Sequence, residues 1–132
     1  MTVFVDTSAL YAVLDRDDDN HTGVIASWKR LLEGIPDLLT TNYVLLEVSA
    51  LLQNRLGLVA LRSFHEDIAP LLRVVWVTDQ QHQAAIGAVL AAARKKLSLV
   101  DCVSFQTMRD HGVRTVFCCD RHFGEQGFDT TP

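Results

Sequence analysis

Four acidic residues of this 132-residue chain stand where carboxylates could share a metal ion, namely Asp6, Glu47, Asp101 and Asp120. Asp6 and Asp120 each follow a short apolar run, and Asp101 lies in the first turn of a predicted helix. Carboxylate oxygens are the ligands that hard cations prefer in proteins. No histidine and cysteine cluster has the spacing of a zinc site. The four residues therefore predict a Mg²⁺ or Mn²⁺ centre, whose natural chemistry is metal-assisted hydrolysis.

Glu47 is the most informative of the four, because its neighbours are nearly all apolar. On a helix it shares one face with Tyr43, Ala50 and Leu51. An uncompensated carboxylate on a buried face is costly and needs a partner. No arginine lies within a turn on that face, so a metal ion is the partner that we expect.

Each carboxylate also has a purely structural interpretation. Asp6 and Asp120 could form turns at the ends of strands. Asp101 could cap its helix, where the helix dipole favours negative charge, and Glu47 could lie at a helix margin and reach solvent. One shared site explains all four residues more simply than four separate coincidences.

The pattern of apolar residues predicts strands that alternate with helices. Asn42, Thr78 and Ser98 are expected to cap helices, and Ser98 with Asp101 fits a capping box. The strand at 73–77 is predicted to be buried. The expected strands are 2–5, 38–41, 73–77, 115–119 and an edge strand at 128–130; the expected helices are 8–14, 21–32, 42–56, 59–68, 78–96, 98–111 and a short turn or helix through Gly124.

Strands separated by helices need crossover connections, which favour a mainly parallel sheet covered on both faces. We therefore expect an α/β fold, a three-layer α/β/α sandwich, in one domain over residues 1–132. The functional crevice of such a sheet lies beyond the carboxyl ends of its strands. Asp6, Asp101 and Asp120 should accordingly converge on one rim.

The bulk properties are those of a globular protein that we expect to be soluble and cytoplasmic. No apolar run reaches the roughly 20 residues of a membrane span, and the N-terminus does not resemble a signal peptide. Three cysteines, Cys102, Cys118 and Cys119, indicate buried thiols in a reducing compartment. The net charge of −4 argues against a nucleic-acid partner. If four acids hold a cation, however, the remaining acidic and basic side chains balance.

With these residues placed, the sequence resembles the PIN-domain ribonucleases, and closely the VapC-like toxins of toxin–antitoxin pairs. The resemblance spans essentially the whole chain, in the family's order and spacing. The matching stretches are VDTSALY at 5–11, TNYVLLEV at 41–48, LSLVDC at 97–102 and CDRHF at 119–123.

The resemblance implies an α/β/α fold, Mg²⁺ or Mn²⁺ bound by carboxylates, and cleavage of single-strand-type RNA. It also implies a homodimer and an antitoxin that blocks the site. Asp6, Glu47, Asp101 and Asp120 would be the acidic ligands, with Ser8 or Thr7 as a polar neighbour of Asp6. Where the family often has Thr or Ser two residues before the last acid, this chain has Cys118, a weaker hydrogen-bonding side chain.

Several alternatives remain open at this stage. A receiver domain would show an acidic pair where residue 5 is Val, and a dehalogenase-type phosphatase would have a second Asp where Ser8 stands. A housekeeping RNA-processing or DNA-cutting nuclease of the same fold is the main alternative, followed by a non-catalytic PIN-like interaction domain. The sequence identifies neither the RNA nor the number of metal ions.

Other features also allow two interpretations. Arg121 or His122 either contacts phosphate or orients its loop, and the His122-Phe123 pair is interpreted as mainly structural. The run 94–96, Arg-Lys-Lys, either faces RNA or is the solvated last turn of a helix. Two apolar stripes are candidate surfaces for association, although core packing would use the same residues: Val24, Trp28 and Leu31, or Val59 and Phe64.

Overall fold

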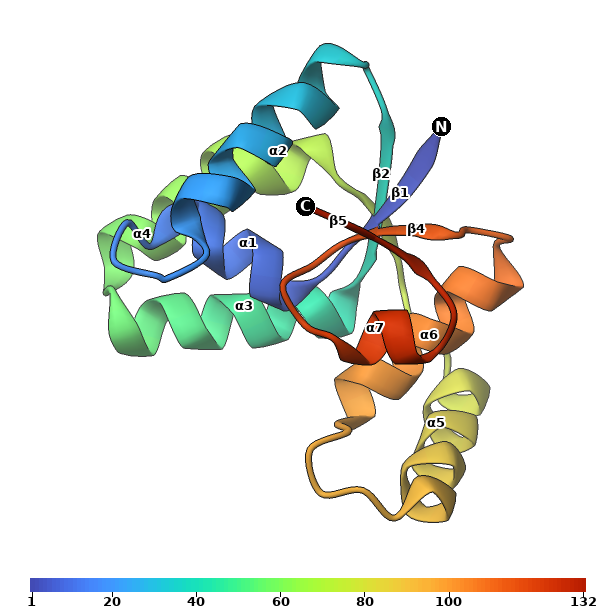
Figure 1. Ribbon diagram of the computed structural model, residues 1–132. Helices are drawn as coiled ribbons and strands as arrows, with labels where there is room; N and C mark the ends of the chain where they lie inside the picture. The colour runs from blue at the N-terminus through green and yellow to red at the C-terminus, as the bar shows by residue number, and fades with distance from the viewer.

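Backbone hydrogen bonds join five strands into one sheet in a computed structural model that describes all residues, 1–132 (Figure 1). The strands are β1 (Thr2–Val5), β2 (Asp37–Thr41), β3 (Arg73–Val75), β4 (Thr115–Phe117) and β5 (Asp129–Thr131). Their order is β3-β2-β1-β4-β5, and every pair is parallel. The predicted parallel sheet is confirmed. The chain order reverses between β1 and β4, and ligands of open α/β sheets bind at such a switch point.

Helices cover both faces of the sheet, as the three-layer prediction requires. In Figure 1, α1 to α4 gather on one side of the strands, and α5 and α6 lie on the other. No helix is both long and apolar enough to span a membrane. The helices are α1 (Thr7–Leu14), α2 (His21–Glu33), α3 (Asn42–Arg55), α4 (Leu58–Ser63), α5 (Asp79–Ala92), α6 (Leu99–Asp110) and α7 (His122–Glu125).

The central strand β1 is enclosed from Val3 onward, because it has a strand on either side and helices above and below, whereas Thr2 at its start is half-buried. Val3, Phe4 and Val5 expose no surface. Burying three such side chains contributes several kcal/mol, at about 1.5–3 kcal/mol each. This packing fixes the end of β1, and hence Asp6, within the molecule.

Local capping signals predicted the correct helix start in two of three cases. Thr78 and Ser98 each form a complete capping box, with Gln81 and Asp101 as the reciprocal partners. The prediction for α3 was wrong by one residue, because Thr41 caps this helix. Asn42 instead accepts a hydrogen bond from the amide of Val77 over 2.8 Å and so ties α3 to the chain after β3.

Strand β3 differs most from its prediction. It is three residues long rather than five, and it lies at the edge of the sheet rather than buried within it. Arg73 is exposed and forms an ion pair with Asp37 over 2.6 Å, while Trp76 is 72% exposed. An apolar run alone does not tell an edge strand from a central one, because the number of pairing neighbours is a tertiary property.

Two predicted helices end differently. Helix α5 stops at Ala92, and Ala93 adopts a left-handed conformation with φ of 52°, so the basic run 94–96 lies in a loop and is not a last helical turn. The helix predicted over 59–68 divides at Phe64 into α4 and a π-helical turn over Phe64–Ile68. Phe64 and Val24 are completely buried, and Trp28 is 8% exposed. These three residues therefore belong to the core and not to an association surface.

Candidate metal centre

Asp6 is held by the end of β1 and the start of α1. It is the N-cap of α1, and its Oδ2 accepts hydrogen bonds from the backbone amide of Ser8 at 3.2 Å and the Ser8 hydroxyl at 2.7 Å. Such a cap satisfies a helix amide that otherwise lacks a partner. Asp6 therefore has a structural role as a helix cap rather than as a turn former, and its second carboxylate oxygen is not used by these hydrogen bonds.

Burial makes Asp6 an unusual carboxylate. Asp6 is 3% exposed, and the loss of hydration raises the pKa of its carboxyl to about 7, although the hydrogen bonds from Ser8 oppose that change. The negative charge of Asp101 raises the pKa of Asp6 further. A buried carboxylate beside another one needs a cation to remain ionised.

Asp101 reaches the same rim from α6. It is the third residue of that helix, and its Oδ2 accepts from the backbone amide of Ser98 at 3.1 Å in the capping box. Burial raises the pKa of Asp101, the hydrogen bonds from Ser98 lower it, and the charge of Asp120 raises it. Capping and site membership are thus compatible for this residue.

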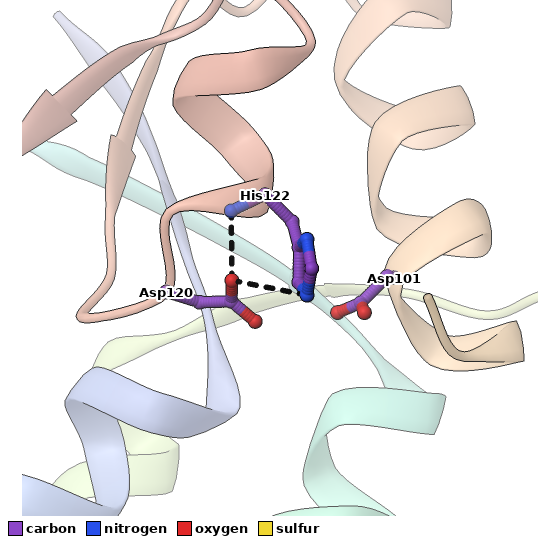
Figure 2. Close-up of side chains that lie close together, drawn as sticks. All are labelled: Asp101, Asp120 and His122. Atoms are coloured by element: carbon purple, nitrogen blue, oxygen red, sulfur yellow. Dashed lines mark hydrogen bonds and ion pairs between the residues drawn. The ribbon is translucent and has the colours of Figure 1, made fainter. Parts of the chain in front are cut away.

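Asp120 follows β4, the strand next to β1, and completes a compact group with Asp101 and His122 (Figure 2). One ligand atom from each of the three residues lies within 4.8 Å of the other two. Asp120 Oδ1 accepts from the amide of His122 at 2.7 Å, which orders the turn into α7. Figure 2 shows the His122 ring between the two carboxylates.

His122 belongs to this group, whereas the sequence suggested mainly a structural role. The residue is 8% exposed, and its buried Nδ1 atom has no hydrogen-bond partner. The only signal in the sequence was the position of His122 two residues after Asp120. The spacing alone does not show that the turn after Asp120 brings the imidazole of His122 back toward the Asp120 carboxylate.

The position of Glu47 is only partly as predicted. The side chains that α3 buries are those of Val44, Val48 and Leu52, and Glu47 is half-buried beside them. It does not belong to the group of atoms within 4.8 Å, but α3 begins at the same rim and packs against α6. Glu47 lies roughly 9 Å along the helix axis from the Thr41 cap. Its role as a fourth ligand stays a prediction.

Cys118 stands where the resemblance leads us to expect Thr or Ser. Its Sγ donates to the carbonyl oxygen of Asp120 over 3.4 Å, so it still braces the turn that carries this carboxylate. Burial raises the pKa of the Cys118 thiol to about 12, and the charges of Asp6 and Asp120 act in the same direction. A neutral thiol is the form that donates this hydrogen bond.

The donor set fits a divalent cation. Asp6, Asp101 and Asp120 each commit one oxygen to a local hydrogen bond. Asp101 and Asp120 belong to the group of ligand atoms within 4.8 Å, whereas Asp6 lies outside that group and is near enough for the charge of Asp101 to act on it. Burial raises the pKa of Asp6 and of Asp101, and the charge of Asp101 on Asp6 and of Asp120 on Asp101 raises them further. Oxygen donors of this kind suit Mg²⁺ and Mn²⁺.

Comparison with known proteins gives a consistent match over the length of the chain. A family model described as the PIN domain matches residues 3–129. A Mycobacterium tuberculosis protein described as the 23S rRNA-specific endonuclease VapC20 is 30% identical over 128 residues, and the match covers 96% of this chain and 95% of the relative.

Solved structures agree with that match. The crystal structure of Mycobacterium tuberculosis VapC20, described as a sarcin-ricin loop cleaving toxin, aligns with a TM-score of 0.84 and 30% identity over 98% of this chain and 99% of its own. FitAcB from Neisseria gonorrhoeae aligns with a TM-score of 0.70 over 100% and 97% of the two chains. FitAB bound to an IR36 DNA fragment aligns with a TM-score of 0.70 over 98% and 93%. At 17% and 18% identity, the last two establish likeness of fold alone.

Proposed function

This chain belongs to the PIN-domain family, and on that premise we propose that it is a Mg²⁺- or Mn²⁺-dependent endoribonuclease that acts as the toxin of a toxin–antitoxin pair. The observation that carries the proposal is the group of Asp101, Asp120 and His122, whose ligand atoms lie within 4.8 Å of one another, together with the buried carboxylate of Asp6, on which the charge of Asp101 acts. The match to a named toxin endonuclease over nearly the whole chain supports RNA as the substrate.

The acidic side chains would bind the metal ion, and neighbouring groups orient them. Asp6, Asp101 and Asp120 would hold the cation, with Glu47 as the fourth acid, and Ser8 orients Asp6. A bound divalent cation supplies an activated water and neutralises charge on the phosphate. The protein's own contribution is to fix these oxygens before substrate arrives, through the two helix caps and the turn at Asp120.

Cationic side chains around the acidic site support docking of a phosphate backbone. Arg121, next to Asp120, has a side chain that is 81% exposed. Lys95 and Lys96 are exposed in the loop after α5, and Arg94 of the same loop forms an ion pair with Glu125 of α7 over 3.2 Å. The loop therefore lies beside the metal centre despite the net negative charge of the chain. Lysine and arginine contacts to phosphate provide most of the affinity for nucleic acid.

Association with a second copy and with an antitoxin is part of the proposal. Leu58 and Val59 at the start of α4 are 67% and 82% exposed, which is unusual for large apolar side chains and supports an interface there. An antitoxin would reach the acidic site with an arginine or lysine, because a cation can pair with metal-ligand carboxylates and displace the ion.

Cleavage of RNA with and without divalent metal tests the enzymatic part. We expect cleavage with Mg²⁺ or Mn²⁺, none in EDTA, and a loss of orders of magnitude in Asp101→Asn. Asp110→Asn, an exposed acid at the far end of the same helix, is the matched control and should keep full activity. Undiminished cleavage in EDTA by contaminant-free protein contradicts the metal mechanism.

Co-expression tests the toxin role. Growth arrest by this protein alone, relieved by the product of a neighbouring open reading frame that co-purifies with it, is the expected result. Harmless expression of an active nuclease without a co-purifying partner would instead favour a housekeeping RNA-processing or DNA-cutting enzyme. Expression of Asp101→Asn controls for toxicity that does not depend on the site.

A further inference from the structure

The five histidines of the chain differ in one respect that the carboxylate site does not explain. Four of them use a ring nitrogen in a hydrogen bond, with Ala12, Ser49, Tyr43 and Thr107 as the respective partners of His21, His65, His82 and His111. His122 alone has none, although its side chain is only 11% exposed and its Nδ1 atom is buried. A buried imidazole nitrogen without a hydrogen bond has lost its contact with water and gained no partner in return.

Both ring nitrogens of His122 point at carboxylates but stop beyond hydrogen-bond distance. Nε2 is 3.7 Å from Oδ1 of Asp120, and Nδ1 is 3.6 Å from Oε2 of Glu125. Figure 2 shows the ring between Asp120 and Asp101. On the Asp101 and Asp120 side, the donor atoms leave a gap that a cation could fill, since one atom of each residue lies within 4.8 Å of the others.

The Nδ1 side of the His122 ring faces a carboxylate that has its own ion pairs. Glu125 forms ion pairs with Arg94 at 3.2 Å and with Arg121 at 3.7 Å, and its carboxylate lies next to Nδ1. A histidine that binds a metal through one nitrogen usually donates its other N–H to a carboxylate, which orients the ring and raises its basicity. The carboxylate of Glu125, the imidazole of His122 and the aspartates Asp101 and Asp120 follow one another in the order that this arrangement requires.

We propose that Nε2 of His122 is a direct ligand of the cation in this chain, with Glu125 as the carboxylate that orients the ring. The inference rests on the proposed metal-dependent function and deepens it, because one imidazole converts an all-oxygen centre into a mixed nitrogen and oxygen centre. Imidazole binds transition metals well, whereas Mg²⁺ prefers oxygen ligands. The site should therefore favour Mn²⁺ over Mg²⁺, and His122 should be the cause.

The rival explanation is that His122 is a protonated imidazolium that simply pairs with Asp120 and Glu125. In that case the ring repels a cation and contributes no nitrogen to its coordination. Spectroscopy of bound Mn²⁺ separates the two explanations without reference to catalysis.

The experiment adds Mn²⁺ to metal-free protein and records electron spin-echo envelope modulation. We expect ¹⁴N couplings in the native protein that disappear in His122→Asn, together with at least tenfold weaker Mn²⁺ binding and a smaller change for Mg²⁺. Glu125→Gln should keep the couplings and weaken Mn²⁺ binding less. His111→Asn is the control, because His111 lies at the opposite end of α6 and is bonded to Thr107.

A second sample keeps the test decisive if His122→Asn fails to fold. Native protein labelled with ¹⁵N-histidine should show ¹⁵N in place of ¹⁴N modulation, and the other four histidines have their own partners. Bound Mn²⁺ with no histidine coupling overturns the inference, and if RNA is still cleaved the proposed function stands without it. Failure of Mn²⁺ to bind overturns both. Coupling that persists in a folded His122→Asn variant also overturns the assignment.

Discussion

The Ser8 hydroxyl donates a 2.7 Å hydrogen bond to Oδ2 of Asp6. The same oxygen of Ser8 accepts from the backbone amide of Cys119 at 2.9 Å, so one side chain joins the first acid after β1 to the segment after β4. This segment leads directly to Asp120. Ser8 thereby couples the positions of two carboxylates that are 114 residues apart in the sequence.

Replacement of Ser8 by alanine tests this coupling. Ser8→Ala removes a hydrogen bond to a charged group, worth about 1.5–3 kcal/mol, and leaves the amide of Cys119 without its acceptor. We expect divalent-metal affinity and RNA cleavage to fall about 10- to 100-fold, as for other residues that orient metal ligands. Ser104→Ala is the matched control, because the Ser104 hydroxyl is buried without a hydrogen bond. Equal effects of the two variants would contradict a coupling through Ser8.

The raised pKa of Asp6 predicts how the metal-free protein responds to pH. Its folded-state pKa is about 7, against an ordinary value of 3.8. Between pH 3.8 and about pH 7, the Asp6 carboxyl keeps its proton in the folded chain but has lost it in the unfolded chain. The contribution of Asp6 to the free energy of unfolding is therefore greatest below about pH 4 and is lost as the pH rises through about 7. The loss is at most about 4 kcal/mol, from 1.36 kcal/mol for each pKa unit. Asp101, whose pKa is also raised, acts in the same direction.

Thermal melting at about pH 5 and about pH 8 measures this effect. The metal-free native protein should melt lower at the higher pH, and Asp6→Asn should reduce the difference, because asparagine does not titrate. Mn²⁺ should raise the melting temperature chiefly at the higher pH, where the carboxylates are free to bind it. An unchanged pH difference in Asp6→Asn would remove Asp6 as the cause.

Glu47 offers a test of whether the fourth acid belongs to the site. It is half-buried and has neither a hydrogen bond nor an ion pair within the chain, so Glu47→Gln should change the free energy of unfolding by less than about 0.5 kcal/mol. As a metal ligand, its charge should still be needed, and RNA cleavage should fall by orders of magnitude. Glu66→Gln, at an exposed position, is the control. Full activity of Glu47→Gln would place this residue outside the site.

The three cysteines should be unreactive in the folded protein. Burial raises the pKa of Cys118 to about 12 and of Cys119 to about 11, and it also raises that of Cys102. Since the thiolate is the nucleophile, iodoacetamide at about pH 8 should modify none of them within the time that labels all three in denaturant. Mass spectrometry gives the count. Rapid labelling of native Cys118 would mean that its environment is not the one described.

The sequence predicted most helix starts and the approximate strand positions correctly, because each depends on residues close together in the chain, while the four site acids remain a prediction. Ser98 and Asp101 are three residues apart and form their capping box wherever the helix lies. Asp6 caps α1 through Ser8, two residues away. Parallel strands joined by helices must also place their carboxyl ends on one rim, so alternation alone predicted that Asp6 after β1 and Asp120 after β4 lie at the same rim.

Tertiary structure decided what depends on distant neighbours. The apolar run at β3 became an exposed edge strand because it pairs only with β2. Glu47 became half-buried because α3 turns Val44, Val48 and Leu52 into the core instead. His122 joined the site because Asp101, from another helix, stands opposite the turn that carries it. Local hydrogen bonds are encoded within a few residues, whereas the burial and coordination of a side chain depend on which surfaces meet once the whole chain has folded.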